Sequence, residues 1–359
     1  MSNSELHMPL KMHPILFEKV WGGSRLCDVA GKKSAHLDAA KVGESWEVAD
    51  LKEGCSVVDG GPFDGISLRD LATEYGRHFV GDVDKNDAGE FRFPLLVKLI
   101  DTSADLSVQV HPSKDNAHLF ENAASKDECW WVLDADKGAK LASGMISDAT
   151  AGDVTRDDLK KALDDKTPEK LLRFVDVKAG DALHIQPGTV HAIGAGVFLL
   201  EVQEPSDTTF RVWDYERPGL DGKPRKLHVE QALQVMHFGE QPPALTELVS
   251  LGEPGKCEQF LVVDTASYRL ERLCFNKAAL ATFAKRTNTP WVVSSTNAAI
   301  DVAAGTYRVH LEPYSTCIVP ALVDQVVLFS MGAGDVLISG LSGAQLVTKP
   351  SLIITKSST

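Results

Sequence analysis

The most informative stretch of this sequence reads Gly180-Asp-Ala-Leu-His-Ile-Gln-Pro-Gly-Thr-Val-His191. The apolar run Ala182–Ile185 predicts a short β-strand, and the Pro-Gly pair after it predicts a turn. Taken by itself, the stretch is also compatible with an ordinary β-hairpin that has a polar rim. It is nevertheless typical of the whole chain, because most other segments are also predicted to be short β-strands.

The strands expected elsewhere share a run of apolar residues bounded by Gly, Pro, Asn or Asp. They are Pro94–Ile100, Leu106–Val110, Cys129–Leu133, Val197–Val202, Thr209–Trp213, Phe260–Asp264, Arg269–Phe275, Trp291–Val293, Thr306–Leu311, Ser315–Val319, Gln325–Phe329 and Asp335–Ile338. We expect helices in four ranges, about 64–80, 113–125, 155–176 and 228–237. Ser67 and Thr155 each precede an aspartate by three residues, which is typical of a helix N-cap. A β-barrel core with helical decorations is therefore expected.

The stretch Phe238-Gly-Glu-Gln-Pro-Pro-Ala-Leu245 is the best domain boundary, because paired prolines and a glycine interrupt any regular element. We expect one domain over 1–240 and a second over 241–359. A faint repeat links them, since Cys317-Ile-Val-Pro-Ala-Leu-Val-Asp324 shares the spacing of 184–191 but lacks its glycine and last histidine. Any two β-turn-β segments can look this similar. If the repeat is real, it predicts two related barrels, one chemically competent and one degenerate.

The composition limits the classes of function. With 37 Lys and Arg against 50 Asp and Glu, the net charge of −13 argues against nucleic acid or an anionic membrane as a partner. The N-terminus lacks a secretory signal pattern, and no apolar stretch approaches the roughly 20 residues that span a bilayer. Six widely spaced cysteines predict reduced thiols rather than a disulfide framework. We therefore expect a cytoplasmic protein.

The segment Ser107-Val-Gln-Val-His-Pro112 places two possible metal ligands on one strand. Alternation along a strand sends Gln109 and His111 to the same face, about 7 Å apart. An amide oxygen and an imidazole nitrogen in this arrangement can bind one metal ion. Such a pair can equally be polar surface residues.

The 180–191 stretch follows the pattern G-x5-Q-x-G-x2-H, which resembles the second motif of the cupin superfamily. The stretch departs from that motif at two positions. Gln186 stands where the motif usually has proline, and Ala195 stands where it usually ends in asparagine. The first cupin motif is poorly kept, because Gln109-x-His111 replaces a histidine pair and Glu128 follows 17 residues later. These departures are those of type I mannose-6-phosphate isomerases, and the sequence resembles their short bacterial branch.

Further motifs follow that family in order over about the first 240 residues. They are Trp21-Gly-Gly, Gly43-Glu-Ser-Trp-Glu-Val, Phe93-Pro-Leu-Leu-Val-Lys-Leu-Ile, Leu106-Ser-Val-Gln-Val-His-Pro, Lys126-Asp-Glu-Cys-Trp-Trp-Val, Pro187-Gly-Thr-Val-His-Ala-Ile and Leu200-Glu-Val-Gln-Glu-Pro-Ser-Asp-Thr-Thr-Phe-Arg-Val-Trp-Asp-Tyr. The resemblance implies a mainly β fold of two cupin-like (jelly-roll) β-barrels, with helical insertions in the N-terminal part. Beyond about residue 240 the likeness is only architectural.

The resemblance also implies site residues. Its metal ligands are Gln109, His111, Glu128 and His191, a mixed N/O set suited to one Zn²⁺ per chain, with Mn²⁺ or Fe²⁺ left open. Its catalytic residues are Lys126, Glu201 and Arg211, and its substrate-binding residues are Lys98, Ser107 and Arg217. Without the resemblance, Lys126 would be a solvated loop charge, and Glu201 would be expected to pair with Arg211.

The activity implied is reversible isomerisation of mannose 6-phosphate and fructose 6-phosphate through a cis-enediol. Glu201 is the first choice of base, with Lys126 or a metal-bound hydroxide as alternatives. The local charge supports an anionic sugar-phosphate substrate, because Thr209–His228 holds five basic and three acidic residues and so carries +2. The alternatives are a non-catalytic sugar- or metabolite-binding cupin, another metal-dependent cupin sugar isomerase, or a cupin dioxygenase.

Overall fold

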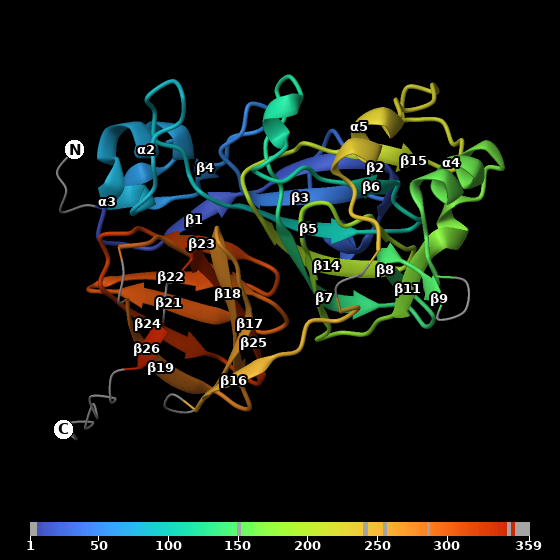
Figure 1. The fold of residues 1–359 in the computed structure, drawn as a ribbon. Coiled ribbons are helices and arrows are strands. Elements are labelled where there is room, and N and C mark those ends of the chain that lie inside the picture. The colour runs from blue at the N-terminus through green and yellow to red at the C-terminus, as the bar shows by residue number, and fades with distance from the viewer. Residues whose placement is uncertain are drawn as a thin grey trace, which may run out of the picture. The chain divides into compact units, whose positions relative to one another are not determined.

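The computed structural model describes residues 6–148, 152–239, 243–253, 257–285, 288–342 and 346–348. Its contacts divide the chain into two compact units, of which one comprises Pro14–Gly54 and Leu95–Glu247. The other comprises Met1–His13, Cys55–Pro94 and Leu248–Thr359. Each unit is built mainly from β-strands (Figure 1), as the sequence predicts.

The unit of Pro14–Gly54 and Leu95–Glu247 contains two sheets. The six-stranded sheet has the order β12-β7-β14-β5-β3-β2 and the five-stranded sheet the order β11-β8-β13-β6-β15. Their bounds are β2 Ile15–Gly23, β3 Val42–Val48, β5 Leu96–Asp101, β6 Val108–Val110, β7 Glu128–Ala135, β8 Lys140–Met145, β11 Leu172–Asp176, β12 Ala182–Ile185, β13 His191–Ile193, β14 Val197–Gln203 and β15 Phe210–Trp213. A short ribbon of β9 Ser147–Asp148 and β10 Gly152–Asp153 lies apart from both.

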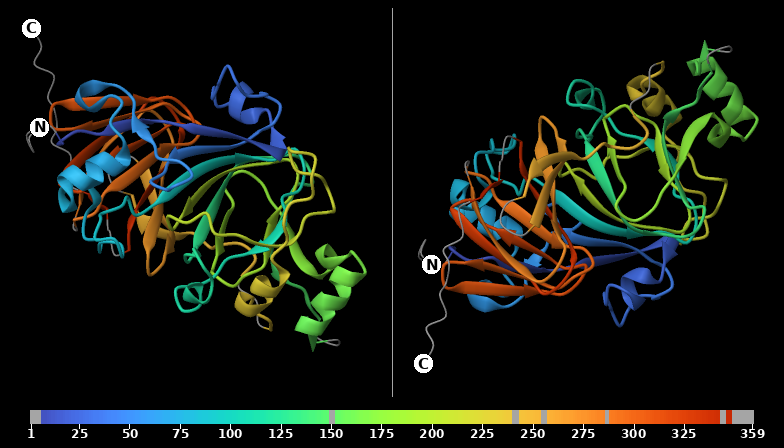
Figure 2. Two further views of the ribbon diagram at one scale, coloured as in Figure 1. Left: turned by 90° about the horizontal axis from the view of Figure 1, so that it is seen from above. Right: turned by 90° about the horizontal axis from the view of Figure 1, so that it is seen from below.

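The two sheets face each other (Figure 2), and their apolar side chains form a common core. Trp130 and Leu199 from the six-stranded sheet and Leu141 and Ile193 from the five-stranded sheet belong to one buried cluster. The cluster therefore joins the sheets in the way that a sandwich core does.

The described strands form sheets with open ends in their hydrogen-bonding order. A closed barrel is accordingly not seen within the described residues, and the cupin or jelly-roll assignment stays a prediction. The coarser prediction of a mainly β fold is confirmed.

The helices of this unit are short and lie at its periphery. They are α1 Arg25–Asp28, η2 Ala117–Leu119, α4 Arg156–Asp164, η3 Pro168–Leu171 and α5 Val229–Val235. The N-cap predicted for α4 is confirmed, because Thr155 accepts a hydrogen bond from the Asp158 N–H and the Asp158 carboxylate caps the Thr155 N–H in return. The expected helical range 113–125 contains only the three-residue 3₁₀ helix η2.

The second unit also contains two sheets, with the orders β16-β17-β18-β25-β20-β23-β1-β4 and β22-β21-β24-β19-β26. The bounds are β1 Leu10–His13, β4 Val57–Val58, β16 Val249–Gly252, β17 Cys257–Asp264, β18 Tyr268–Phe275, β19 Ala279–Lys285, β20 Trp291–Ser295, β21 Ile300–Ala304, β22 Tyr307–Leu311, β23 Thr316–Val319, β24 Gln325–Ser330, β25 Gly334–Leu341 and β26 Leu346–Thr348. Its helices are η1 Gly61–Phe63, α2 Leu68–Tyr75 and α3 Arg77–Val80. Ser67 caps α2 through the Asp70 N–H, as predicted.

Segments far apart in sequence meet in this second unit. Strand β1 pairs with β23, so that Leu10 lies opposite Ile318, and this pairing groups the N-terminal strand with the C-terminal sheets. The boundary predicted at 240/241 stays a prediction, and residues 240–242 of that stretch lie outside the described residues. Within the described part of the chain, no helix has the length and apolar character needed to cross a membrane.

Candidate active site

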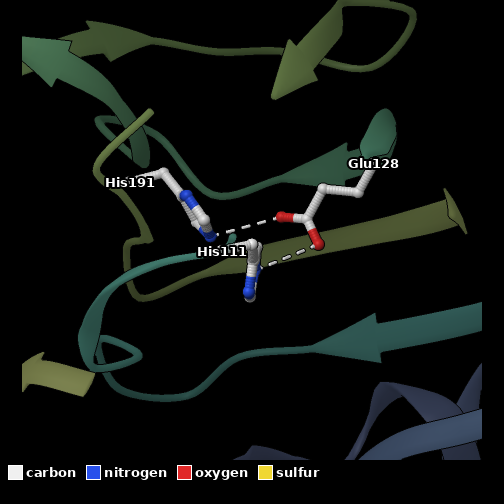
Figure 3. A group of neighbouring side chains, drawn as sticks. All are labelled: His111, Glu128 and His191. Atoms are coloured by element: carbon white, nitrogen blue, oxygen red, sulfur yellow. Dashed lines mark ion pairs between the residues drawn. The ribbon is translucent and has the colours of Figure 1, made fainter. Parts of the chain in front are cut away.

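Three buried side chains converge inside the unit that contains β5 to β15. The ligating atoms of His111, Glu128 and His191 all lie within 4.8 Å of one another (Figure 3). His111 Nε2 is 3.5 Å from Glu128 Oε2, and His191 Nε2 is 3.3 Å from Glu128 Oε1. All three residues are at most 1% exposed. Two imidazoles and one carboxylate are thus aimed at one point.

Sheet register explains why these residues meet. His191 opens β13, where it pairs with Gln109 of β6, and His111 follows directly after β6. Glu128 opens β7 and pairs with Ile185 at the end of β12. The turn between β12 and β13 closes over His111, because the Gly188 N–H donates to the His111 carbonyl at 2.8 Å.

Glycine is required at position 188 for two reasons. Its φ of +86° is in the left-handed region, and a Cβ atom there would come within 2.6 Å of the His237 ring. The Pro-Gly signal in the sequence therefore marks the turn that brings His191 to the cluster.

Each histidine has its second ring nitrogen fixed by the backbone. Nδ1 of His111 lies 2.7 Å from the Thr208 carbonyl and Nδ1 of His191 lies 2.8 Å from the Thr189 carbonyl. A carbonyl only accepts, so Nδ1 carries the proton and Nε2 keeps a lone pair facing the cluster. Burial lowers the pKa of both rings, that of His111 to about 3 with a further contribution from Lys126. Both imidazoles are therefore neutral near pH 7, the form that binds metals.

The cluster fits a divalent cation on its own chemistry. Glu128 Oε1 is buried and has no hydrogen-bond donor, whereas Oε2 is paired with Lys126 Nζ at 2.5 Å. A buried acceptor is rarely left without a partner, and a cation between the three side chains would satisfy Oε1. The amide group of Gln109, the fourth predicted ligand, lies beside the cluster, with its nitrogen 3.2 Å from His191 Nε2. The oxygen and nitrogen of an amide can exchange places by a flip, so Gln109 can present its oxygen as a ligand.

Lys126 is the cation nearest the cluster. Its Nζ lies 2.5 Å from Glu128 Oε2 and 3.3 Å from His111 Nε2, and the residue is 4% exposed. Burial alone would raise the pKa of Glu128, but Lys126 and His111 hold that pKa well below its usual range. Lys126 is thus a buried site residue and not the solvated loop charge that its local sequence suggests.

A cavity of about 240 Å³ lies next to the cluster, and Gln109 and Lys126 form part of its wall. The other lining residues are Lys19, Trp21, Glu44, Lys98, Ile100, Leu106, Ser107, Ile193, Glu201, Asp207, Thr209, Arg211, Arg225 and His228. Five of the lining side chains are basic and three are acidic, so the cavity carries a formal charge of +2 in a chain of −13. The cavity therefore favours an anionic ligand.

The model of the family described as phosphomannose isomerase type I, catalytic domain, matches residues 10–166. The chain is 38% identical over 235 residues to mannose-6-phosphate isomerase ManA of Bacillus subtilis, covering 65% of this chain and 70% of that protein. It is 35% identical over 245 residues to the mannose-6-phosphate isomerase of Streptococcus mutans, covering 68% and 72% respectively. This chain belongs to the mannose-6-phosphate isomerase family.

A solved structure of the family has the same fold. The mannose 6-phosphate isomerase from Bacillus subtilis superimposes with a TM-score of 0.80 at 27% identity, covering 92% of this chain and 99% of that one. The structural likeness therefore extends beyond residue 240. As a member of this family, the chain is an aldose–ketose isomerase.

The structure brings most of the predicted mannose-6-phosphate isomerase residues to this one cavity. Lys98, Ser107, Gln109, Lys126, Glu201 and Arg211 all line it. Arg217 is not among the lining residues, and its guanidinium instead pairs with Asp214 at 2.9 Å. The substrate-binding role predicted for Arg217 stays a prediction, to which this position lends no support.

Glu201 has different partners from those that its sequence suggests. Its Oε2 lies 3.3 Å from Lys98 Nζ, and its Oε1 accepts a hydrogen bond from the Trp130 indole at 3.0 Å. Arg211 instead donates to the Lys226 carbonyl at 2.9 Å, and its Nε is buried without a partner. Burial raises the pKa of Glu201 despite Lys126 and Lys98 nearby. A buried carboxylate with a raised pKa is suited to proton transfer.

Five ionisable lining residues were not predicted as site residues, namely Lys19, Glu44, Asp207, Arg225 and His228. Glu44 accepts from Lys19 at 3.0 Å and from the Trp46 indole at 2.8 Å, and Lys98 Nζ lies 5.1 Å from the centre of the Trp46 ring. The motif Gly43-Glu-Ser-Trp-Glu-Val carried the signal for Glu44, because it belongs to the family pattern. Arg225, which reaches the cavity from a loop, was marked only as one of the five basic residues of Thr209–His228.

Proposed function

We propose that this chain interconverts mannose 6-phosphate and fructose 6-phosphate, with one Zn²⁺ ion held by His111, Glu128, His191 and Gln109. The observation that carries the proposal is the convergence of two neutral imidazoles on one buried carboxylate, beside a cationic cavity. This N/O donor set is typical of zinc, while Mn²⁺ and Fe²⁺ accept similar ligands. A bound divalent ion would supply positive charge next to the reacting oxygens of the sugar.

The chain's own residues supply the remaining functions. Arg211 stabilises the negative charge that develops on the sugar during enolisation, and the net positive charge of the cavity favours the phosphorylated substrate. Lys126, buried at the edge of the metal cluster, faces the same space and adds a further positive charge. Lys98, which is paired with Glu201 on the neighbouring strand β5, lies 3.3 Å from Glu201 Oε2 and holds that oxygen in place.

Glu201 is the proposed base. It would remove the proton from C2 of the aldose to give a cis-enediol and return it to C1 on the same face, while a second proton moves from O2 to O1. Trp130 donates to Glu201 Oε1, so Oε2, which lies beside Lys98, is the oxygen that would carry the proton. Lys126 is the second candidate for this role.

The test is a direct assay with purified protein and mannose 6-phosphate, followed by measurement of fructose 6-phosphate. We expect turnover that disappears on removal of metal by a chelator and returns with Zn²⁺, Mn²⁺ or Fe²⁺ to different extents. In deuterated water, incorporation of deuterium at C2 or C1 would support proton transfer by an exchanging base.

The same assay separates the alternatives. A sugar-binding cupin without catalytic activity would bind mannose 6-phosphate and produce no fructose 6-phosphate. A different sugar isomerase would leave mannose 6-phosphate unchanged and act on another phosphorylated aldose. Full activity in protein shown by elemental analysis to be free of metal would refute the metal part of the proposal.

A further inference from the structure

A buried aspartate organises two arginines next to the cavity. Asp214 directly follows β15 and is 4% exposed. One of its oxygens accepts from Arg217 Nε at 3.1 Å and Nη2 at 2.9 Å, and the Arg225 Nε and Nη2 donate to the carboxylate at 2.6 and 2.5 Å. A single carboxylate thus fixes two guanidinium groups that approach from different parts of the loop.

The backbone of this loop is strained at the aspartate. Tyr215 and Glu216 both have left-handed φ values, +56° and +52°, which cost non-glycine residues about 1 kcal/mol or more each. The Arg217 N–H donates to the Asp214 carbonyl at 3.2 Å and closes the turn. Such a conformation persists only where surrounding contacts hold it, and the paired arginines provide those contacts.

The two arginines end in different places. Arg225 lines the cavity, whereas Arg217 lies over the Tyr215 ring, 5.4 Å from its centre, and does not line the cavity. Both use Nε and Nη2 to bind Asp214, so within the described residues the Nη1 group of Arg225 has no hydrogen-bond partner. Arg225 therefore presents an unpaired donor edge from the cavity wall.

Arg211 has a similar unpaired edge in the same cavity. Its Nη1 donates to the Lys226 carbonyl, its Nε is buried without a hydrogen-bond partner, and its Nη2 has no partner among the described residues. The His228 N–H donates to the Arg211 carbonyl at 2.7 Å, so β15 and the segment that carries Arg225 are joined. Burial lowers the pKa of Arg211, and the like charge of Arg225 lowers it further. Two neighbouring guanidinium groups with unpaired donors in a confined space favour an anion between them.

We propose that Arg225 binds the phosphate group of the substrate together with Arg211, and that Asp214 is a positioning residue that aims Arg225 into the cavity. This inference rests on the proposed sugar-phosphate function. It assigns the second phosphate-binding arginine to Arg225 and leaves Arg217 as a brace on Asp214. A phosphate dianion accepts bidentate hydrogen bonds from guanidinium groups, which makes it the ligand that this pair fits best.

The test measures the phosphate site separately from catalysis. Binding of inorganic phosphate is measured by calorimetry on the metal-loaded protein, beside KM and kcat for mannose 6-phosphate. We expect Arg225→Gln to weaken phosphate binding and raise KM by about 10- to 100-fold, with bound metal unchanged and kcat within about threefold. Lys223→Gln is the matched control, because Lys223 is an exposed cation of the same loop outside the cavity lining. Lys223→Gln should leave the phosphate affinity and the KM for mannose 6-phosphate within about twofold of the wild-type values.

Arg217→Gln and Asp214→Asn separate the binding role from the positioning role. Arg217→Gln should change phosphate affinity less than Arg225→Gln does, and the reverse order would overturn the assignment. Asp214→Asn should weaken phosphate binding, while Asp214→Asn combined with Arg225→Gln should be no worse than Arg225→Gln alone. Additive losses in the double variant would overturn the positioning role, even if Asp214→Asn also lowers the melting temperature.

The failure of this inference is distinguishable from failure of the proposed function. If Arg225→Gln leaves phosphate affinity and KM within about threefold of wild type while the wild type isomerises mannose 6-phosphate, the inference alone is wrong. If the wild type produces no fructose 6-phosphate, the proposed function is wrong, and the phosphate titration still decides whether Arg225 binds the anion.

Discussion

Glu44 is a buried carboxylate at the cavity wall, and replacing it with glutamine should destabilise the protein in a pH-dependent way. It is 8% exposed and accepts hydrogen bonds from the Lys19 ammonium and the Trp46 indole. Burial opposes its ionisation, but Lys19, Lys98 and Trp46 outweigh burial and lower the pKa of Glu44 to about 2. A neutral glutamine side chain at this position would resemble the protonated acid, which these partners stabilise less.

The magnitude follows from linkage between ionisation and folding. Against an unfolded-state pKa of 4.5, a folded-state pKa of about 2 contributes about 3 kcal/mol to the free energy of unfolding at pH 7. Because the pKa is depressed in the folded protein, the contribution is present above the unfolded pKa and is lost as pH falls through the folded pKa. At pH 3 about 1.4 kcal/mol should remain.

The assay is equilibrium urea unfolding at pH 7 and pH 3, followed by tryptophan fluorescence. Five of the six tryptophans lie in the unit of Pro14–Gly54 and Leu95–Glu247, so the signal reports mainly on the unit that contains Glu44. The difference between wild type and Glu44→Gln should shrink by about half or more between the two pH values. Glu53→Gln, at an exposed position of the same unit, is the control and should change stability by less than about 0.5 kcal/mol. A cost for Glu44→Gln below about 1 kcal/mol at pH 7, or one independent of pH, would refute the reasoning.

Four further outcomes are expected at the candidate metal cluster and the cavity beside it. His191→Ala should lower bound metal and turnover together by elemental analysis and assay, and activity retained without metal would contradict the proposed site. Arg211→Ala should cut kcat by about 100-fold or more with metal content near wild type, whereas metal loss would mean that Arg211 supports the ligands instead. Lys126→Met should also lose turnover. It should bind metal at least as tightly as the wild type, because the substitution removes a positive charge 2.5 Å from Glu128. Weaker metal binding in this variant would contradict the geometry of the cluster. In an acid titration followed by elemental analysis, metal should stay bound well below pH 6.5, because burial lowers the pKa of His111 to about 3. Metal release with a midpoint near pH 6.5 would contradict the burial of this ring.

Local features of the fold could be predicted from the sequence because their causes are local. Ser67 and Thr155 cap α2 and α4 through side-chain contacts that span three residues. The strand Ala182–Ile185 and the turn at Gly188 follow from apolar runs and Pro-Gly punctuation. In contrast, the pairing of β1 with β23 depends on a sheet edge supplied by residues some 300 positions later, and no local pattern encodes it.

The candidate site divides in the same way. His111 and His191 could be found because each stands in a motif with a fixed spacing, and register then brings them together with Glu128. Arg225 could be predicted only as one basic residue of Thr209–His228, because its place in the cavity wall depends on its contact with Asp214, eleven residues earlier in the chain. Arg217 was predicted to bind substrate because it lies next to the motif that matches the family. In the structure its guanidinium donates to Asp214 instead.

Burial has opposite chemical consequences for the acids and bases of this cavity, and the combination suits an isomerase. It lowers the pKa of His111 and His191, which keeps both rings neutral and free to bind metal. It raises the pKa of Glu201, which brings that carboxylate closer to the strength needed to take up a proton and release it again. Lys98 escapes this effect, because Glu201 and Glu44 outweigh the burial and raise its pKa, so it remains charged beside the proposed base. A buried cavity with these pairings can therefore hold neutral metal ligands, a proton-accepting carboxylate and a permanent cation at the same pH.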